Sequence, residues 1–85
     1  MELKEARERI DAVDEILLDA FLKRMALSRE IGRIKAEQGL PLESREREAE
    51  VLDRAMKRSG NLAPYAEELY RCLFTLSKAY QQRGI

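Results

Sequence analysis

Two cations, Arg24 and Lys35, stand out as residues that could bind an anion. Arg24 falls where apolar residues recur in alternating steps of three and four, so its guanidinium would lie in an apolar seam, at a cost unless it is paired. Lys35 follows eleven residues later, and eleven helical steps of about 100° return to nearly the same face. The spacing favours a small anionic ligand between them. The structural alternatives are an ion pair between Arg24 and a glutamate, an Arg24 whose charged end reaches solvent, and a solvated Lys35 near a helix end.

Polar side chains also interrupt the apolar stripes of two later segments. A helical face that starts aromatic becomes polar at Ser77 and Gln81, where a hydroxyl and an amide four residues apart can lie side by side. In the other segment, Glu48 extends the stripe that continues at Val51, and Arg47 stands beside it. These four polar residues are candidates for ligand contacts. The structural alternative for Ser77 and Gln81 is an ordinary helix end that becomes exposed to solvent. The alternative for Arg47 and Glu48 is a solvated first turn.

The residue inventory limits the chemistry of any such site. The chain has no histidine, so the usual general base, transition-metal ligand and partner of a nucleophilic side chain is missing. We therefore expect a reaction with little proton transfer, no metal and no cofactor. The balance of 16 basic and 16 acidic residues argues against a nucleic-acid partner.

The N-terminal sequence and the short apolar runs predict the cellular setting. Residues 1–5 are mostly charged or polar and lack the apolar stretch of a secretion signal. Apolar runs such as Ile16-Leu17-Leu18 are only three residues long, far short of a membrane span. We expect a soluble cytoplasmic protein with no membrane partner.

One long helix must carry Arg24 and Lys35. From Glu2 to about Gln38, Gly32 is the only glycine and proline is absent. Gly39 and Pro41 then favour the end of the helix. The seam follows the a and d steps of a heptad repeat. Its positions are Leu3, Ala6, Ile10, Val13, Leu17, Ala20, Arg24, Leu27, Ile31 and Ile34.

Two shorter helices must position the other candidate side chains. Ser44 suits the N-cap of a helix that continues to about Lys57. We expect residues 59–61, Ser-Gly-Asn, to break that helix and Pro64 to lie in the first turn of a third one. The predicted fold class is all-α, with a long first helix and two shorter helices in a single domain of residues 1–85.

The length of the first helix predicts a dimer. About 37 residues at 1.5 Å per residue make a helix of roughly 55 Å, which two short helices cannot cover. A second copy whose long helix packs against the first would bury the remaining seam. Arg7 stands beside this seam, where it could meet a partner chain, form a simple interchain salt bridge or face solvent.

Taken in order, these residues resemble the all-helical chorismate mutase family, which includes mutase domains fused to prephenate dehydratase or dehydrogenase. The resemblance rests on Arg7, Ile10-Asp11, Val13-Asp14, Leu17-Leu18, Arg24, Lys35, Gly39, Pro41, Arg47-Glu48, Val51-Leu52, Ser77 and Gln81. It implies an intertwined homodimer with two shared sites. The implied reaction is the rearrangement of chorismate to prephenate in phenylalanine and tyrosine biosynthesis.

The resemblance also implies a role for each polar residue. Lys35 and Gln81 would donate to the ether oxygen of chorismate. Arg24, with Arg7 of the other protomer, would hold the two carboxylates through the forked geometry of guanidinium.

The remaining implied contacts come from the second and third helices. Glu48 would accept from the ring hydroxyl, and Arg47 and Ser77 would support the substrate and its neighbours. Ser44 stands near that hydroxyl where the family commonly has an aspartate, so recognition of the hydroxyl depends on whether a carboxylate is needed there.

Two other functions fit the same sequence. An isochorismate–pyruvate lyase of this fold binds a similar dianion and also develops charge at an ether oxygen. A non-catalytic helical dimerisation module would use Arg24 only in an ion pair. The activity on each substrate and the effect of replacing Arg24 separate these hypotheses.

Overall fold

The computed structural model describes residues 1–83, which are all-α as predicted. A long helix, α1 (Leu3–Gln38), is followed by an extended connection and then by α2 (Arg45–Ser59). A 3₁₀ turn, η1 (Gly60–Leu62), leads directly into α3 (Ala63–Arg83), so α2, η1 and α3 form one helical stretch with a sharp bend. Within this described part of the chain, no helix is long and apolar enough to cross a membrane.

The ends of α1 and α2 follow from local chemistry, as predicted. Gly39 adopts a left-handed conformation with φ of 67°, and its N–H donates to the carbonyl of Ala36 over 3.3 Å. Glycine tolerates this conformation because it has no Cβ. At the start of α2, the Ser44 hydroxyl accepts a 3.3 Å hydrogen bond from the N–H of Arg47. The N-cap therefore satisfies one of the donors that a helix start leaves unpaired.

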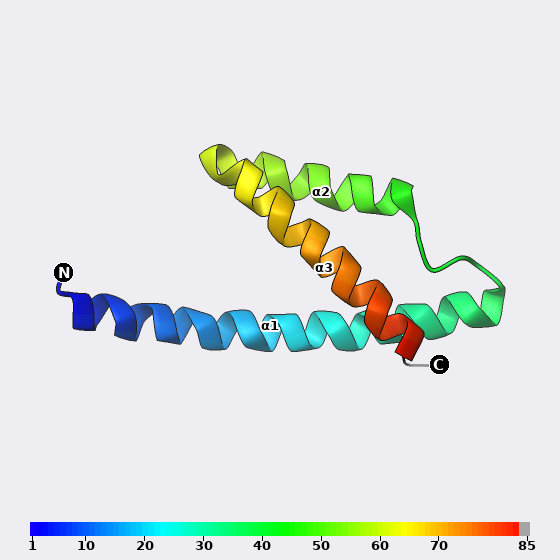
Figure 1. Ribbon diagram of the computed structural model, residues 1–85, viewed down its shortest axis with the longest axis horizontal. Coiled ribbons are helices and arrows are strands. Elements are labelled where there is room, and N and C mark those ends of the chain that lie inside the picture. The colour runs from blue at the N-terminus through cyan, green and yellow to red at the C-terminus, as the bar shows by residue number, and fades with distance from the viewer. Residues whose placement is uncertain (84–85) are drawn as a thin grey trace.

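The predicted break at residues 59–61 is a change of direction rather than a gap between helices. Ser59 is the last residue of α2, and Gly60 turns the chain with φ of 57°. Its 3₁₀ turn ends at Ala63, and Pro64 then lies in the first turn of α3 as expected. The chain reverses direction at Gly60, whose backbone is not helical, and the 3₁₀ turn then leads straight into α3, which explains the hairpin of α2 and α3 in Figure 1.

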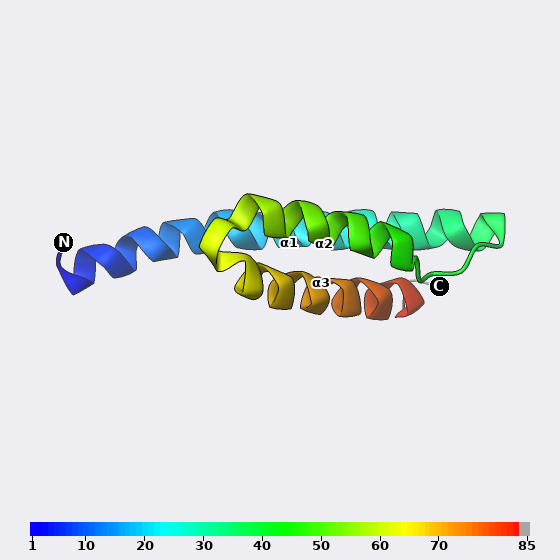
Figure 2. The ribbon, with the colours of Figure 1, turned by 90° about the horizontal axis from the view of Figure 1, so that it is seen from above.

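Helix α3 connects the other two helices. It runs diagonally from the far end of α2 to the C-terminal half of α1 and packs against both helices (Figure 1). The backbones of α1 and α2 are not in contact with each other. Figure 2 shows α3 on one side of the α1–α2 pair. The molecule is elongated, at 54 × 25 × 14 Å.

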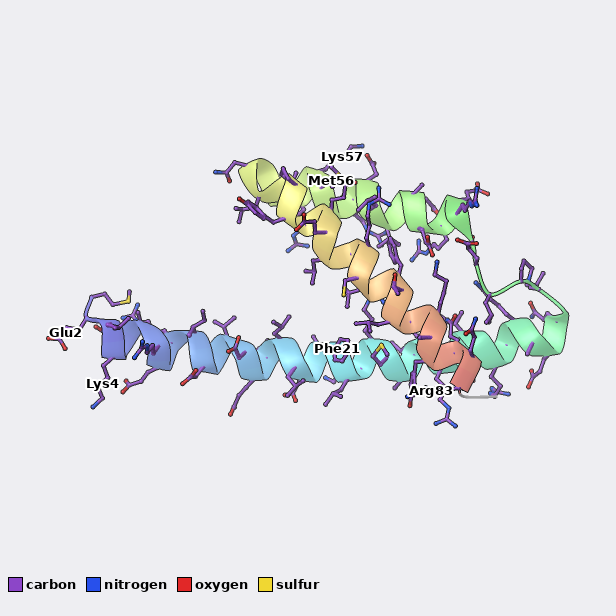
Figure 3. The ribbon with its side chains drawn as sticks, viewed as in Figure 1. Glu2, Lys4, Phe21, Met56, Lys57 and Arg83 are labelled. Carbon is purple, nitrogen blue, oxygen red and sulfur yellow. The ribbon has the colours of Figure 1, made fainter. Side chains whose placement is uncertain are left out.

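The described chain has no buried hydrophobic side chain. Its buried residues are Ser28, Gly32, Ser77 and Gln81, all where α1 and α3 cross. The seam along α1 is largely bare, and Leu17 is 57% exposed and Ile10 59%. Figure 3 shows the end of α1 that carries Glu2 and Lys4 projecting beyond the other helices. The two shorter helices do not cover the long one, as its length predicted.

Candidate active site

The central hollow lies where α1, α2 and α3 converge and measures about 300 Å³. Ligand sites in proteins have volumes from about this size upward. Its polar lining consists of Arg24, Ser28, Lys35, Ser44, Arg47, Glu48, Ser77, Lys78 and Gln81. Its apolar lining consists of Leu27, Ile31, Leu42, Val51 and Phe74. Seven of the eight residues singled out in the sequence therefore meet around one space.

Arg24 is half-buried and joins α1 to α3 through a hydroxyl. Its Nη1 donates a 2.8 Å hydrogen bond to the Oγ of Ser77. Ser28, one turn further along α1, donates from its own Oγ to the same oxygen over 3.0 Å. Among residues 1–83, Arg24 forms no ion pair, so the glutamate partner considered for it is not found in this chain. Its remaining N–H groups are therefore available to an anion.

Gln81 is held against α1 by its amide. The side chain is 7% exposed, and its Nε2 donates a 2.9 Å hydrogen bond to the carbonyl oxygen of Ser28. Because a carbonyl only accepts, this contact fixes which end of the amide faces α1. Nε2 retains a second N–H, while the buried Oε1 has no hydrogen-bond partner in the described structure. The amide is thus oriented but only partly satisfied.

Lys35 closes the other end of the hollow. Its Nζ donates a 2.9 Å hydrogen bond to the carbonyl oxygen of Leu42, in the connection between α1 and α2. The eleven-residue spacing does place Lys35 and Arg24 in the same lining, as the helical period predicted. Since its partner is a neutral carbonyl, the ammonium charge of Lys35 is not offset by that contact.

The start of α2 supplies the second wall. Arg47 and Glu48 line the hollow beside Ser44, whose hydroxyl already serves as the helix cap. Glu48 is the only carboxylate among the lining residues. It lies 3.2 Å from the Nζ of Lys78 on α3, and Glu43 lies 3.4 Å from the same nitrogen. Nη1 of Arg47 lies 3.9 Å from Oε2 of Glu50, which is outside the hollow. The walls therefore combine two cations with neutral partners, Arg24 and Lys35, with one paired carboxylate.

Arg7 lies apart from this group. It is exposed on the N-terminal part of α1, 17 residues before Arg24, and so about 25 Å away along the helix axis. Neither α2 nor α3 reaches that part of α1 (Figure 3). The described chain does not bring Arg7 to the central hollow, so any contribution from Arg7 must come from another copy.

Two polar residues of the hollow, Ser28 and Lys78, were missed in the sequence. Ser28 lies four residues after Arg24, and Lys78 lies four residues after Phe74, so the helical spacing could have indicated both. Lys78 is also next to Ser77, and neighbouring residues on a helix differ by about 100° in direction. Both Ser77 and Lys78 line the hollow although their side chains leave α3 in different directions. The stripe of Ser77 and Gln81 indicated only one of these directions.

Comparison with known proteins identifies the family. The model of chorismate mutase type II matches residues 6–82, and the chain belongs to that family. It is 47% identical over 51 residues to the T-protein of Enterobacter agglomerans, covering 60% of this chain and 14% of that protein. It is 34% identical over 55 residues to the chorismate mutase of Methanocaldococcus jannaschii, covering 65% of this chain and 56% of that protein.

A solved structure has the same fold. The conserved hypothetical protein from Pyrococcus furiosus matches with a TM-score of 0.74 and 32% identity, covering 93% of each chain. In contrast, this chain spans between 13% and 56% of four curated relatives that it matches, including the T-protein of Haemophilus influenzae. The family resemblance inferred from the sequence is confirmed, and the similarity extends over nearly the whole fold.

Proposed function

We propose that this protein rearranges chorismate to prephenate in phenylalanine and tyrosine biosynthesis. The observation that carries the proposal is the central hollow, where Arg24, Lys35 and Arg47 converge with one oriented amide, Gln81, and one carboxylate, Glu48. Chorismate is a dianion with a ring hydroxyl and an ether oxygen. The cations match its carboxylates, and the carboxylate and amide match the two other oxygens.

The reaction needs no group beyond these side chains. A C–O bond breaks as a C–C bond forms within one molecule, so no nucleophile and no proton relay is involved. Arg24, together with Arg7 of a second protomer, holds the two carboxylates so that the substrate adopts its compact reactive conformer. Lys35 and the free N–H of Gln81 donate to the ether oxygen as negative charge develops there.

The second wall of the hollow recognises the ring. Glu48 accepts from the ring hydroxyl, while Arg47 and Ser77 support the substrate and the side chains around it. Ser44 lies in the same lining but caps α2, so it contributes through the position of the helix start. In this proposal, the carboxylate of Glu48 recognises the hydroxyl of chorismate, and the side chain of Ser44 takes no part in that contact.

The functional unit in this proposal is an intertwined homodimer of one-domain chains, residues 1–85. Its support is physical: the described chain buries no apolar side chain, and the seam of α1 is bare. A short chain buries only a small part of its surface on folding, so covering the bare seam would add to its stability. Packing a second α1 on the seam would cover it and bring a second Arg7 toward the hollow, giving two shared sites per dimer.

Incubation of the purified protein with chorismate and, separately, with isochorismate tests the function. We expect chorismate to be consumed with prephenate as the product, and we expect Lys35→Ala to lose most of this activity while Lys23→Ala, an exposed neighbour outside the hollow, retains it. Salicylate and pyruvate formed efficiently from isochorismate would contradict the mutase and favour a lyase. No turnover of either compound would favour a non-catalytic dimerisation module.

A further inference from the structure

Lys78 contacts the only carboxylate that lines the central hollow. From α3, its Nζ lies 3.2 Å from Oε2 of Glu48 on α2 and 3.4 Å from Oε1 of Glu43 in the connection before α2. The side chains of Lys78 and Glu48 are 32% and 29% exposed, whereas Glu43 is 52% exposed. The pair with Glu48 is therefore the more sheltered of the two, and it links α2 to α3 across the hollow.

The surroundings of Lys78 differ from those of the other cations in the lining. Arg24 contacts a hydroxyl and Lys35 a carbonyl, so the positive charges of these two remain available to an anion. Arg47 has a single carboxylate nearby, that of Glu50 at 3.9 Å. Lys78 has two carboxylates within 3.4 Å of one nitrogen. These two negative charges outweigh its own, so a substrate carboxylate gains little by approaching it.

The raised pKa of Lys78 favours a permanent contact between its ammonium group and Glu48. The hydrogen bond to Glu48 raises the pKa of Lys78 above its ordinary value of 10.5, with a smaller contribution from Glu43, while partial burial opposes the shift. The ammonium therefore stays charged through the neutral range. A cation on Oε2 leaves Oε1 of Glu48 free to accept a hydrogen bond from a ligand.

We propose that Lys78 is a positioning residue that holds the Glu48 carboxylate oriented toward the ring hydroxyl of the substrate. The inference rests on the proposed function, because it needs a substrate with a hydroxyl at that wall. Lys78 itself does not touch the substrate. Its effect on catalysis passes through Glu48, which makes the two residues interdependent.

A double-mutant cycle of Lys78→Met and Glu48→Gln tests this dependence. Residues in direct contact are energetically coupled, so we expect Lys78→Met to lower kcat/KM of the parent protein by about tenfold. With Glu48→Gln already present, the same change should lower kcat/KM less than about twofold. Lys78→Arg, which keeps a cation on the carboxylate, should retain most of the activity.

Glu43→Gln is the matched control, because it removes the other carboxylate contact of Lys78 at a residue outside the central hollow. We expect little change in kcat/KM. Nuclear magnetic resonance titration of Lys78 in labelled protein then measures the pair without substrate. The midpoint should fall on Glu48→Gln and fall less on Glu43→Gln, because Glu48 makes the larger contribution to the raised pKa.

The outcomes separate this proposal from the function itself. Equal losses from Lys78→Met in the parent and Glu48→Gln backgrounds, or an unchanged Lys78 titration on Glu48→Gln, would overturn the positioning role while leaving the mutase activity intact. A rise in KM with unchanged kcat, independent of residue 48, would instead assign Lys78 to direct substrate attraction. A parent protein without chorismate turnover would overturn both proposals.

Discussion

The side chain of Gln81 packs directly on Gly32. A Cβ at residue 32 would lie 2.9 Å from Cγ and 3.0 Å from Cβ of Gln81, closer than such atoms approach in folded proteins. The absence of a side chain at Gly32 lets α3 come close enough to α1 for the Gln81 amide to reach the carbonyl of Ser28. The position of this amide in the central hollow therefore depends on a glycine in the facing helix.

Gly32→Ala should lower activity without unfolding the protein. The added Cβ meets the inner part of the Gln81 side chain, which cannot swing away, so α3 or Gln81 must shift. Misplacement of a catalytic group by about 1 Å can cost a hundredfold in rate. We expect kcat/KM to fall about tenfold or more, and a gain in helix propensity of up to about 1 kcal/mol to offset part of the lost packing.

The matched control for Gly32→Ala is the same change combined with Gln81→Ala. If the glycine acts through Gln81, Gly32→Ala should lower kcat/KM almost no further once Gln81→Ala is present. Circular dichroism and the melting temperature report whether both variants fold. A Gly32→Ala variant with unchanged turnover would show that the close approach has no catalytic consequence.

Arg24→Leu should abolish most activity while preserving the fold. Ser77 keeps its hydrogen bond from Ser28, so the substitution leaves no buried hydroxyl without a partner. Replacing a half-buried charge by an apolar side chain is often neutral or stabilising. Loss of one member of a buried charge pair costs about 2–5 kcal/mol, so kcat/KM should fall by about a hundredfold or more.

Lys23→Leu is the control for Arg24→Leu, because Lys23 is exposed and lies outside the central hollow. It should retain the turnover of the parent protein. Steady-state kinetics with chorismate and thermal melting decide between the two readings of Arg24. Full activity in a folded Arg24→Leu variant would restrict the arginine to a structural role.

The parts of this molecule that the sequence predicted are those controlled by local chemistry. The end of α1 at Gly39 and the start of α2 at Ser44 depend on residues within a few positions of each other. The shared lining of Arg24 and Lys35 follows from the period of one helix. The bend at Gly60 was expected as a break, because local residue types signal a turn but not that a 3₁₀ turn leads directly from it into the next helix.

The contacts that the sequence did not predict join distant parts of the chain. Arg24 and Ser77 are 53 residues apart, and only the crossing of α3 over α1 brings them together. Lys78 was overlooked because its partners lie on α2 and in the preceding connection, 30 or more residues away. Arg7 stays outside the hollow of the described chain, because the period of a single helix contains no information on a second protomer.

A mixture of Arg7→Ala and Arg24→Ala subunits should recover activity that neither variant has alone. In a mixed dimer, one site receives Arg24 from the first variant and Arg7 from the second, while the other site lacks both. After random exchange of subunits, about a quarter of the parent activity is expected, since half the dimers are mixed and half their sites are intact.

Subunit exchange must be verified in this experiment, for example by mass spectrometry of differently labelled chains. The two variants kept apart provide the baseline. Verified mixed dimers with no activity above that baseline would contradict a site shared between protomers, and they would leave Arg7 without a role in binding the substrate.

Leu17→Asp should separate the protomers. Leu17 lies in the bare seam of α1 and is 57% exposed in the described chain, so a charge there is tolerated by a monomer but not by an apolar interface. Light scattering should show the mass fall from twice 9.9 kDa to 9.9 kDa. Helix content should fall as well, because no apolar side chain is buried within one described chain.

Glu8→Lys is the control for Leu17→Asp, since it changes the charge on the opposite face of α1. It should leave the mass of the assembly unchanged. A parent protein that scatters as a 9.9 kDa particle at all concentrations would contradict the dimer, whatever the variants do.

The pair of Lys78 and Glu48 predicts a stability difference that disappears in alkali. The pKa of Lys78 is raised, chiefly by its hydrogen bond to Glu48, so the folded protein holds this proton more tightly than the unfolded chain does. The resulting stabilisation is fully present below pH 10.5, the ordinary value, and is lost as the pH rises through the raised pKa. The melting temperature of the parent protein should therefore exceed that of Glu48→Gln by a constant amount from pH 8 to about pH 10, and the difference should shrink above that range. The remaining side chains are common to both proteins, so their effects largely cancel in the comparison. A difference that persists or grows in alkali would show that Glu48 stabilises the fold by some means other than charged Lys78.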